Sequence, residues 1–291
     1  MTVDELPFLG VGLAYRFEIR EEILANSDRF DFLELITDHY IDMPPHRQEE
    51  ARELAGLFPL VIHGVDLSIG THRGVQREYL AKVRQVREWS SALWASDHLC
   101  MTQAHGRNIS QLTPISFDPR TVEAVRRNVE TVREVVDCPF LLENISYYFQ
   151  VPPCSMTEAE FLREVFTRCD CWLLLDLTNV YNNARNNGYD AFDFLDHIPL
   201  DRVVQLHLAG GEEEGGILLD THSRPIHPEV FELLRYSAGR MPRLKGAIIE
   251  RDQAIPPTPE LLDEMDRIRE ILAAEWAPPH RSATTSQLSW L

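Results

Sequence analysis

Side chains able to bind metal ions recur through the sequence, mostly at the ends of short apolar segments. They are histidines, carboxylates and one amide, namely His63, His98, Glu143, Asp176, Asn179, His207, Asp220, His222 and Glu250. Imidazole and carboxylate donors without sulfur suit iron, zinc or manganese better than copper(I) or an iron–sulfur cluster. The sequence does not choose among these metals.

A single histidine or glutamate at a strand end is more often a hydrogen-bonded structural residue than a ligand. The whole set is different, because acids that converge without cations repel one another and are forced to bind protons. Bound metal removes that cost. So many donors would be used by two or three ions, with Glu143 as the bridge and Glu250 or Asp176 as further bridging candidates.

The donors can converge only if the fold brings their segments together. Eight apolar segments predict strands at Phe8–Tyr15, Phe30–Ile36, Pro59–Val65, Trp94–Leu99, Phe140–Ser146, Cys171–Thr178, Val203–Gly210 and Gly246–Asp252. The amphipathic segments between them predict helices at about 18–27, 46–57, 75–90, 119–136, 158–168, 190–197, 228–238 and 259–274. This alternation predicts an α/β fold, a (β/α)8 TIM barrel, in which the carboxyl ends of all strands form one rim. An open doubly wound sheet is the alternative, but no Gly-x-Gly-x-x-Gly follows any strand.

Length and composition fit one globular barrel. We expect a single domain over residues 1–275 and a flexible tail over 276–291. The 46 acidic and 28 basic residues give a net charge of −18, which disfavours binding to nucleic acid or an anionic membrane surface. No apolar run is long enough to span a membrane. Five cysteines without a Cys-x-x-Cys pair indicate a reducing, cytoplasmic location.

Three other features carry weaker expectations. Glu34 lies within the second strand, and its expected role is to orient a metal ligand. The acidic run Glu212–Glu214, beside Gly215 and Gly216, is expected to be a solvated mobile loop. Cys100 follows the fourth strand without an obvious base and is expected to be a buried thiol.

Several of the donor-bearing segments together resemble the DUF692 family of multinuclear non-haem iron-dependent oxidative enzymes, which includes the methanobactin oxazolone-forming subunit and the thiaglutamate-pathway enzyme. The matching segments are His63-Gly-Val-Asp-Leu-Ser68, Ser96-Asp-His-Leu99, Leu142-Glu-Asn144, Leu175-Asp-Leu-Thr-Asn179, Leu206-His-Leu-Ala-Gly210, Leu219-Asp-Thr-His222 and Ile249-Glu-Arg-Asp252. The resemblance runs from about residue 8 to 262, and the ordered series is specific although each segment alone is weak.

The resemblance implies a xylose-isomerase-like TIM barrel and a metal set similar to that of the endonuclease IV branch of that superfamily. The one departure in that set is Asn179, which stands where the branch has a histidine, so the third metal site should be weaker or Asn179 should face substrate. Within the matching segments, the candidates for catalytic residues are Asp66, Asn144, Asn179 and Asp252. A second departure, Asp38-His39-Tyr40, bears on the substrate more than on the chemistry.

The function implied by the resemblance is an oxidative modification of a cysteine residue in a ribosomally synthesised precursor peptide. The implied cofactors are two or three iron ions in mixed Fe2+/Fe3+ states, with O2 as co-substrate. The implied partner is a small leader-peptide-binding protein, in a heterodimer. Two alternatives stay open: a redox-neutral zinc- or manganese-dependent hydrolase or sugar isomerase on the same barrel, and a metal-storing or scaffolding subunit without enzymatic activity.

Overall fold

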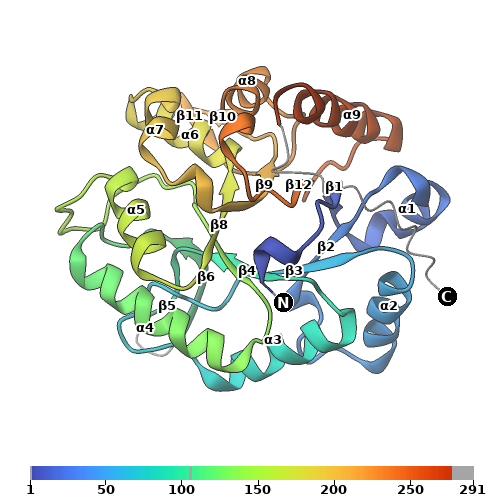
Figure 1. Ribbon diagram of the computed structural model, residues 1–291, viewed down its shortest axis with the longest axis horizontal. Coiled ribbons are helices and arrows are strands. Elements are labelled where there is room, and N and C mark those ends of the chain that lie inside the picture. The colour runs from blue at the N-terminus through green and yellow to red at the C-terminus, as the bar shows by residue number, and fades with distance from the viewer. Residues whose placement is uncertain (1, 105–106, 277–291) are drawn as a thin grey trace.

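The computed structural model describes residues 2–104 and 107–276, and it forms a closed barrel of eight parallel strands surrounded by helices (Figure 1). Around the barrel the strands follow the order β1-β12-β9-β8-β7-β4-β3-β2. Their bounds are β1 Gly10–Ala14, β2 Leu33–Ile36, β3 Leu60–Gly64, β4 Ala95–His98, β7 Phe140–Glu143, β8 Trp172–Asp176, β9 Val203–Leu208 and β12 Gly246–Ile249. Each lies within a strand predicted from the sequence, so the (β/α)8 prediction is confirmed.

The helices occupy the outer layer, where one apolar face of each packs on the strands. Their bounds are α1 Arg20–Ala25, α2 Pro45–Ala55, α3 Arg77–Ser90, α4 Pro119–Val135, α5 Glu158–Arg168, α6 Leu177–Asn187, α7 Ala191–His197, α8 Pro228–Ser237 and α9 Thr258–Glu275. Helix α4 begins where the Asp118 side chain accepts two backbone N–H groups, and α5 begins in a capping box between Thr157 and Glu160.

The amino end of the barrel is closed by apolar side chains. Val3 and Leu6, on and beside a short N-terminal helical turn, pack against an inner layer contributed by the strands. That layer consists of Ala14, Phe32, Val61, Trp94, Leu141, Leu174, Val204 and Ile248. Every one of these side chains is almost fully buried, so this end is a packed core.

The next inward layer, toward the carboxyl ends of the strands, is polar. Side chains in a strand alternate between faces, so a position two residues further along points into the barrel again. Two residues beyond the apolar layer the chain places Glu34, His63, Ser96, Glu143, Asp176 and Glu250. The barrel therefore carries imidazoles and carboxylates directly above a dry core.

Helix α6 corrects the sequence prediction around strand β8. We expected that strand to run to Thr178, with no helix before residue 190, but β8 ends at Asp176 and α6 follows at once. The physical reason is the Asp176 side chain, which accepts the backbone N–H of Asn179 at 2.7 Å and so caps the helix. The apolar residues Leu177 and Val180 bury one face of α6.

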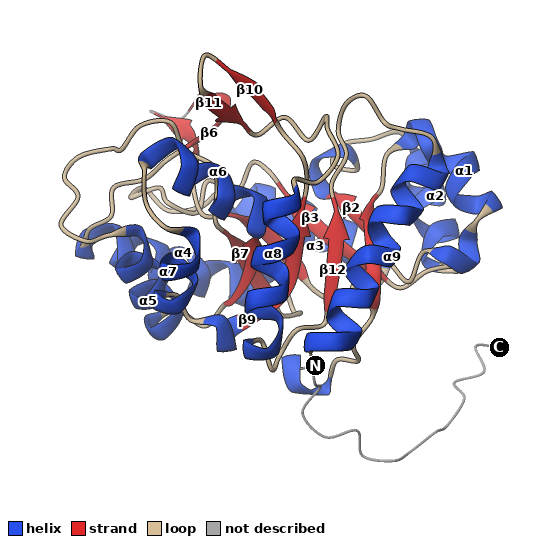
Figure 2. Ribbon diagram, turned by 90° about the horizontal axis from the view of Figure 1, so that it is seen from above, coloured by secondary structure: helices blue, strands red, loops and turns tan. Residues whose placement is uncertain are grey.

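Two β-hairpins extend from the carboxyl end of the barrel, and the sequence analysis predicted neither. They consist of β5 Met101–Ala104 with β6 Arg107–Thr113, and of β10 Glu212–Glu214 with β11 Ile217–Leu219. Figure 2 shows β6, β10 and β11 at one end of the barrel and the N-terminus near the other.

The second hairpin has paired strands where a loop was expected for the acidic run. Its turn residues Gly215 and Gly216 have φ values of 60° and 83°, the positive angles that a two-residue hairpin turn requires. The Asn186 side chain exchanges two hydrogen bonds with the backbone of Leu218, at 2.8 and 2.9 Å, and so attaches the hairpin to α6.

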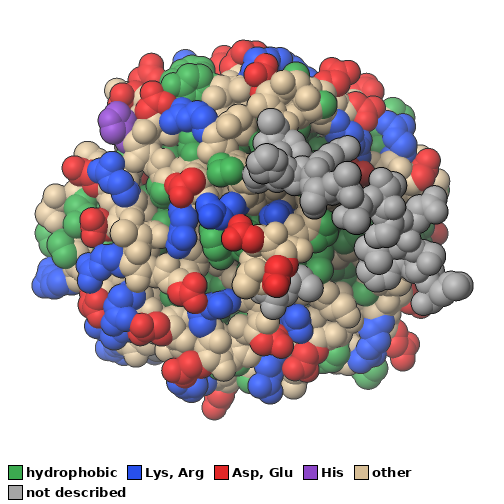
Figure 3. Space-filling model, in the orientation of Figure 1, with side chains coloured by type: hydrophobic (Ala, Val, Ile, Leu, Met, Phe, Trp, Pro, Cys, Tyr) green, Lys and Arg blue, Asp and Glu red, His purple; other side chains and the backbone are tan. Residues whose placement is uncertain are grey.

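Trp276, the first residue of the expected tail, contacts the barrel domain. The Trp276 indole donates to the Met241 carbonyl at 2.9 Å. The centroids of the Trp276 and Phe8 rings are 4.4 Å apart. The remainder of the expected tail, residues 277–291, lies outside the described residues. In the described part of the chain, no helix has the length and apolar character to cross a bilayer. Figure 3 shows acidic and basic side chains interspersed over the face seen in Figure 1.

Candidate metal centre

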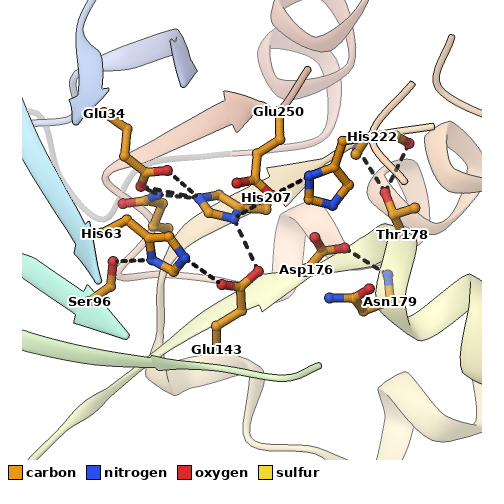
Figure 4. Close-up of polar contacts among 12 residues, drawn as sticks. Glu34, His63, Ser96, Glu143, Asp176, Thr178, Asn179, His207, His222 and Glu250 are labelled. Carbon is orange, nitrogen blue, oxygen red and sulfur yellow. Dashed lines mark hydrogen bonds and ion pairs between the residues drawn. The ribbon is translucent and has the colours of Figure 1, made fainter. Parts of the chain in front are cut away.

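The first group of donors joins strands β3, β4 and β7. His63 Nε2 lies 3.2 Å from Glu143 Oε2, His98 Nε2 lies 3.4 Å from the same oxygen, and the two nitrogens are 3.3 Å apart. The three atoms converge on one point, and Figure 4 shows His63 and Glu143 pointing toward each other inside the barrel.

Hydrogen bonds on the far side of each imidazole fix which nitrogen is available. His98 Nδ1 faces the Gly64 carbonyl at 3.2 Å, and a carbonyl only accepts, so Nδ1 carries the proton. His63 Nδ1 lies 2.9 Å from Ser96 Oγ, which itself donates to the Ile62 carbonyl. Ser96 therefore accepts from His63 Nδ1. Both Nε2 atoms therefore have lone pairs that point toward the Glu143 carboxylate. These groups repel one another, and a cation between them would remove the repulsion.

The second group shares Glu143 and adds donors from β8, β9 and the end of β12. His207 Nδ1 lies 3.1 Å from Glu143 Oε1 and 3.1 Å from Glu250 Oε2. Asp176 completes a set of four buried donors whose ligand atoms lie within 4.8 Å of one another. Because its two oxygens serve different groups, Glu143 is placed to bridge two metal ions.

A third group lies beside the second, nearer to solvent. His222 Nε2 is 2.9 Å from Asp220 Oδ1, and His222 Nδ1 is 3.0 Å from Asp252 Oδ2 and 3.7 Å from Glu250 Oε2. Asp252 also accepts from the buried guanidinium of Arg16. The expected ligands Asp220 and His222 thus meet each other, and they reach the second group through Glu250.

Burial and charge act strongly on this centre in the absence of metal. Burial alone would lower the pKa of His207, but Glu250, Glu34 and Glu143 raise it well above its ordinary value. Burial raises the pKa of Asp176 well above the usual range, and the neighbouring carboxylates Glu143 and Asp220 raise it further. Without metal, the centre would therefore hold extra protons to limit the repulsion among its acids.

The donor set fits bound metal by a second criterion. Two of its atoms, Glu143 Oε2 and Asp176 Oδ2, are buried with no hydrogen-bond partner. Buried polar atoms in native proteins are otherwise paired. Oxygen and imidazole nitrogen are suitable ligands for iron, zinc or manganese. The residues present can therefore hold a multinuclear centre.

Comparison with known proteins identifies the family. The model of the family described as RiPP precursor modification enzyme MbnB/TglH/ChrH matches residues 10–273, where RiPP denotes a ribosomally synthesised and post-translationally modified peptide. The chain belongs to this family. A UPF0276 protein of Caulobacter vibrioides (strain NA1000 / CB15N) is 36% identical over 282 residues, which cover 95% of this chain and 98% of the relative. A UPF0276 protein of Pseudomonas aeruginosa (strain UCBPP-PA14) is 34% identical over 267 residues, covering 90% and 92%.

Solved structures share the fold at low sequence identity. D-psicose 3-epimerase from Clostridium cellulolyticum H10 aligns with a TM-score of 0.58 and 10% identity, over 92% of this chain and 98% of that one. A xylose isomerase domain protein from Planctomyces limnophilus gives 0.56 and 9%, over 92% and 98%. Endonuclease IV from Thermus thermophilus gives 0.55 and 18%, over 92% and 100%. These likenesses confirm the xylose-isomerase-like barrel of this family member.

Two expected catalytic residues of the family member lie beside Asp176, where their amides form protein contacts. The Asn144 side chain donates to the Asp176 carbonyl at 3.0 Å and accepts the Asp176 N–H at 2.9 Å. Asn179 Nδ2 donates to the Asn144 carbonyl at 3.0 Å, and its Oδ1 accepts from Ser146 at 2.6 Å. Both amides thereby hold β7, β8 and α6 in register at the centre.

Asp66, another of the expected catalytic residues, lies further out. It is half-buried on the loop between β3 and α3, and its carboxylate accepts from Asn108 of β6 at 2.7 Å. The structure therefore places Asp66 against the first hairpin rather than within the two buried donor groups of the centre.

The sequence analysis missed three residues that serve the centre. Ser96 orients His63, Arg16 holds Asp252, and Gln205 lies behind His207. Ser96 and Gln205 each precede a predicted ligand on the same strand by two residues, and this inward spacing was available as a signal. Arg16 carried no such signal, because its contact with Asp252 spans 236 positions.

A buried hydrogen-bond chain sets the orientation of His207. The Trp94 indole donates to Gln205 Oε1, which leaves the Gln205 amide N–H groups facing Glu34. Glu34 lies 3.0 Å from His207 Nε2 through Oε1 and 3.1 Å through Oε2. His207 Nδ1 also faces carboxylates, Glu143 and Glu250, so the metal-free imidazole holds a proton on that nitrogen. An ion at the second group would displace this proton, with Glu34 behind the ring at Nε2.

We expect Glu34→Gln to weaken metal binding at the second group by about 10–100-fold, because an amide polarises the imidazole less than a carboxylate does. Competitive chelator titration of the purified variant measures the change. Glu50→Gln is the matched control, since Glu50 accepts from Tyr15 on the outside of the barrel. An unchanged metal affinity of the Glu34→Gln variant would show that Glu34 does not orient His207 for metal binding.

Proposed function

We propose that this family member uses two or three iron ions and O2 to oxidise a cysteine residue in a ribosomally synthesised precursor peptide. The observation that supports the proposal most directly is the convergence of two buried donor groups on the bridging carboxylate of Glu143. A single-ion enzyme would not need the second group. Membership of a family of RiPP precursor modification enzymes supports the peptide substrate.

In this proposal each donor group of the chain has a separate task. His63, His98 and Glu143 hold one ion; Glu143, Asp176, His207 and Glu250 hold another. Bound iron would supply the one-electron chemistry with O2 that no side chain of the protein can supply. Asp220 and His222 form a third, more exposed group for an exchangeable ion.

The remaining predicted residues support the centre in this proposal. Asn144 and Asn179 fix the backbone around Asp176, so we assign them a positioning role that precedes any contact with substrate. Asp252 is the one expected catalytic residue that reaches a donor of the centre while 41% of its side chain stays exposed. We therefore propose Asp252, held by Arg16, as the group that meets the peptide.

The open end of the barrel supports a macromolecular substrate. Tyr148 and Phe149 follow β7 and expose 50% and 58% of their surface, and Ile217 on the second hairpin exposes 46%. The Tyr148 hydroxyl accepts the backbone N–H of Asp220 at 3.1 Å, so these apolar groups begin next to the centre. A small partner protein that delivers the leader segment forms part of the proposal, with the two hairpins as sheet edges for strand addition.

Metal content and oxygen consumption test the proposed function together. We expect anaerobically purified protein from iron-replete cells to contain two or three irons per chain, by plasma mass spectrometry. Supplied with its precursor peptide and partner, it should consume O2, and a peptide with serine in place of cysteine should not be modified. Stoichiometric zinc or manganese with O2-independent turnover would contradict the proposal and favour a hydrolase or isomerase.

A further inference from the structure

A cavity lies outside the barrel, between the loop after β7 and helices α5 and α7. Its volume is about 830 Å³. Helices α5 and α7 lie side by side in Figure 1, and both contribute lining residues to the cavity. Its aromatic lining residues are Tyr147, Tyr189 and Phe194. None of these residues belongs to the donor groups of the metal centre.

The carboxylate of Glu158 is held at this cavity by two tyrosines. Glu158 Oε2 accepts from the Tyr147 hydroxyl at 3.0 Å and from the Tyr189 hydroxyl at 3.5 Å. Among the described residues, no hydrogen bond or ion pair reaches Oε1. Burial raises the pKa of Glu158 to about 7, although the two tyrosine hydrogen bonds act in the opposite direction. A cation brought to Oε1 would offset that cost of burial.

Other charges at the cavity are mostly negative, and several are already used. Glu160 and Asp190 accept backbone N–H groups as caps of α5 and α7. Asp193 lies 3.7 Å from His197 at the rim, and Arg163 is the other basic residue of the lining. Glu158 differs from these three carboxylates because two tyrosine hydroxyls hold it within the cavity. The aromatic rings beside it can contact a cation and its aliphatic stem.

We propose that this cavity binds an ammonium or guanidinium group carried on an aliphatic chain, with Glu158 as its counter-charge. Tyr147 lines the cavity, while the next residue, Tyr148, contacts Asp220 at the metal centre. If the proposed function holds, on which this assignment of the source rests, the group is a lysine or arginine side chain of the precursor peptide. A free alkylamine is the other source of the same chemistry.

Calorimetric titration of the full-length protein at pH 8 tests the inference. The probes are the blocked pentapeptide acetyl-Gly-Gly-Lys-Gly-Gly-amide, its norleucine analogue, and n-butylammonium chloride. We expect the lysine peptide to bind at least about tenfold tighter than the norleucine peptide, the range of a charge-assisted hydrogen bond. Butylammonium binding as tightly as the lysine peptide would indicate a free amine, and weaker binding a peptide side chain.

The variant Glu158→Gln should abolish the preference for lysine while its amide oxygen still accepts from the tyrosines. Asp193→Asn is the matched control and should retain most of the preference, because Asp193 lies at the exposed rim. Equal affinities for the two peptides, or a preference that survives Glu158→Gln, would overturn the inference. Binding is measured without turnover, so a protein that does not oxidise cysteine can still pass this test, and an active oxidase can fail it.

Discussion

Glu143→Gln is expected to empty both buried metal groups and to reduce turnover by more than about 100-fold, beyond the usual effect of removing a residue that only orients a ligand. Glu143 is the one residue shared by the two groups, with Oε2 facing His63 and His98 and Oε1 facing His207. A glutamine amide presents its N–H groups to one of these sides, where they hydrogen-bond to an imidazole lone pair and displace metal. On the other side its carbonyl oxygen carries no charge and binds the second ion weakly. The fold should tolerate it, because the side-chain volumes are nearly equal.

Metal content per chain and circular dichroism of the same samples measure this result. Two variants provide graded controls. Of the two buried groups, His98→Ala should lose metal from the first only, and Glu250→Gln from the second only, since each residue belongs to one of them. A Glu143→Gln protein that retains two ions per chain, or loses one only, would show that this carboxylate does not bridge.

Asp176→Asn is expected to have opposite effects on the metal-free and the metal-loaded protein. Its carboxyl group is fully buried among other acids, and its pKa is raised well above the usual range by burial and by Glu143. At pH 8 the metal-free wild type must therefore either protonate this group or keep an unpaired charge. Asparagine removes the charge and still caps α6, so we expect metal-free Tm to rise by about 2–6 °C. Metal at the second group should be lost.

The difference in Tm between metal-free Asp176→Asn and the metal-free wild type should change with pH in one direction. A carboxyl group whose folded-state pKa is raised stabilises the fold fully below its unfolded pKa, near 4, and this stabilisation is lost as pH rises through the folded pKa. The Tm of the metal-free asparagine variant should therefore exceed that of the wild type by an amount that grows from about pH 4 upward. Thermal unfolding of chelator-treated protein across that range measures it.

Asp118→Asn is the matched control for that experiment. Asp118 also caps a helix, α4, but its pKa is lowered: the backbone N–H groups of Thr121 and Arg120 outweigh the opposing effect of burial. Its substitution should reduce stability above pH 4 and leave metal content unchanged. If the Tm of metal-free Asp176→Asn lies below that of the wild type at pH 8, other groups of the protein stabilise the negative charge of Asp176 without metal.

Local sequence signals located the barrel strands, because buried parallel strands are short apolar runs bounded by polar clusters. They also located most of the side chains that converge in the candidate metal centre, since His63, Glu143 and Glu250 each close such a run. They did not locate α6, because this helix follows β8 without a gap and its sequence, Leu177–Asn187, is mostly polar and rich in asparagine. The hairpin β10–β11 was missed because its acidic residues resemble a solvated loop, and what holds it is Asn186 of α6.

By itself, the sequence therefore determined the fold class, the family and the chemical types of the donors, since these depend on local patterning and on ordered motifs. Only the tertiary structure decided how the donors divide into groups, that Glu143 serves two of them, and which nitrogen each imidazole offers. The tautomers of His63 and His98 depend on Ser96 and Gly64, which lie on other strands. Such contacts follow from strand register around a closed barrel, and no local sequence pattern contains that information.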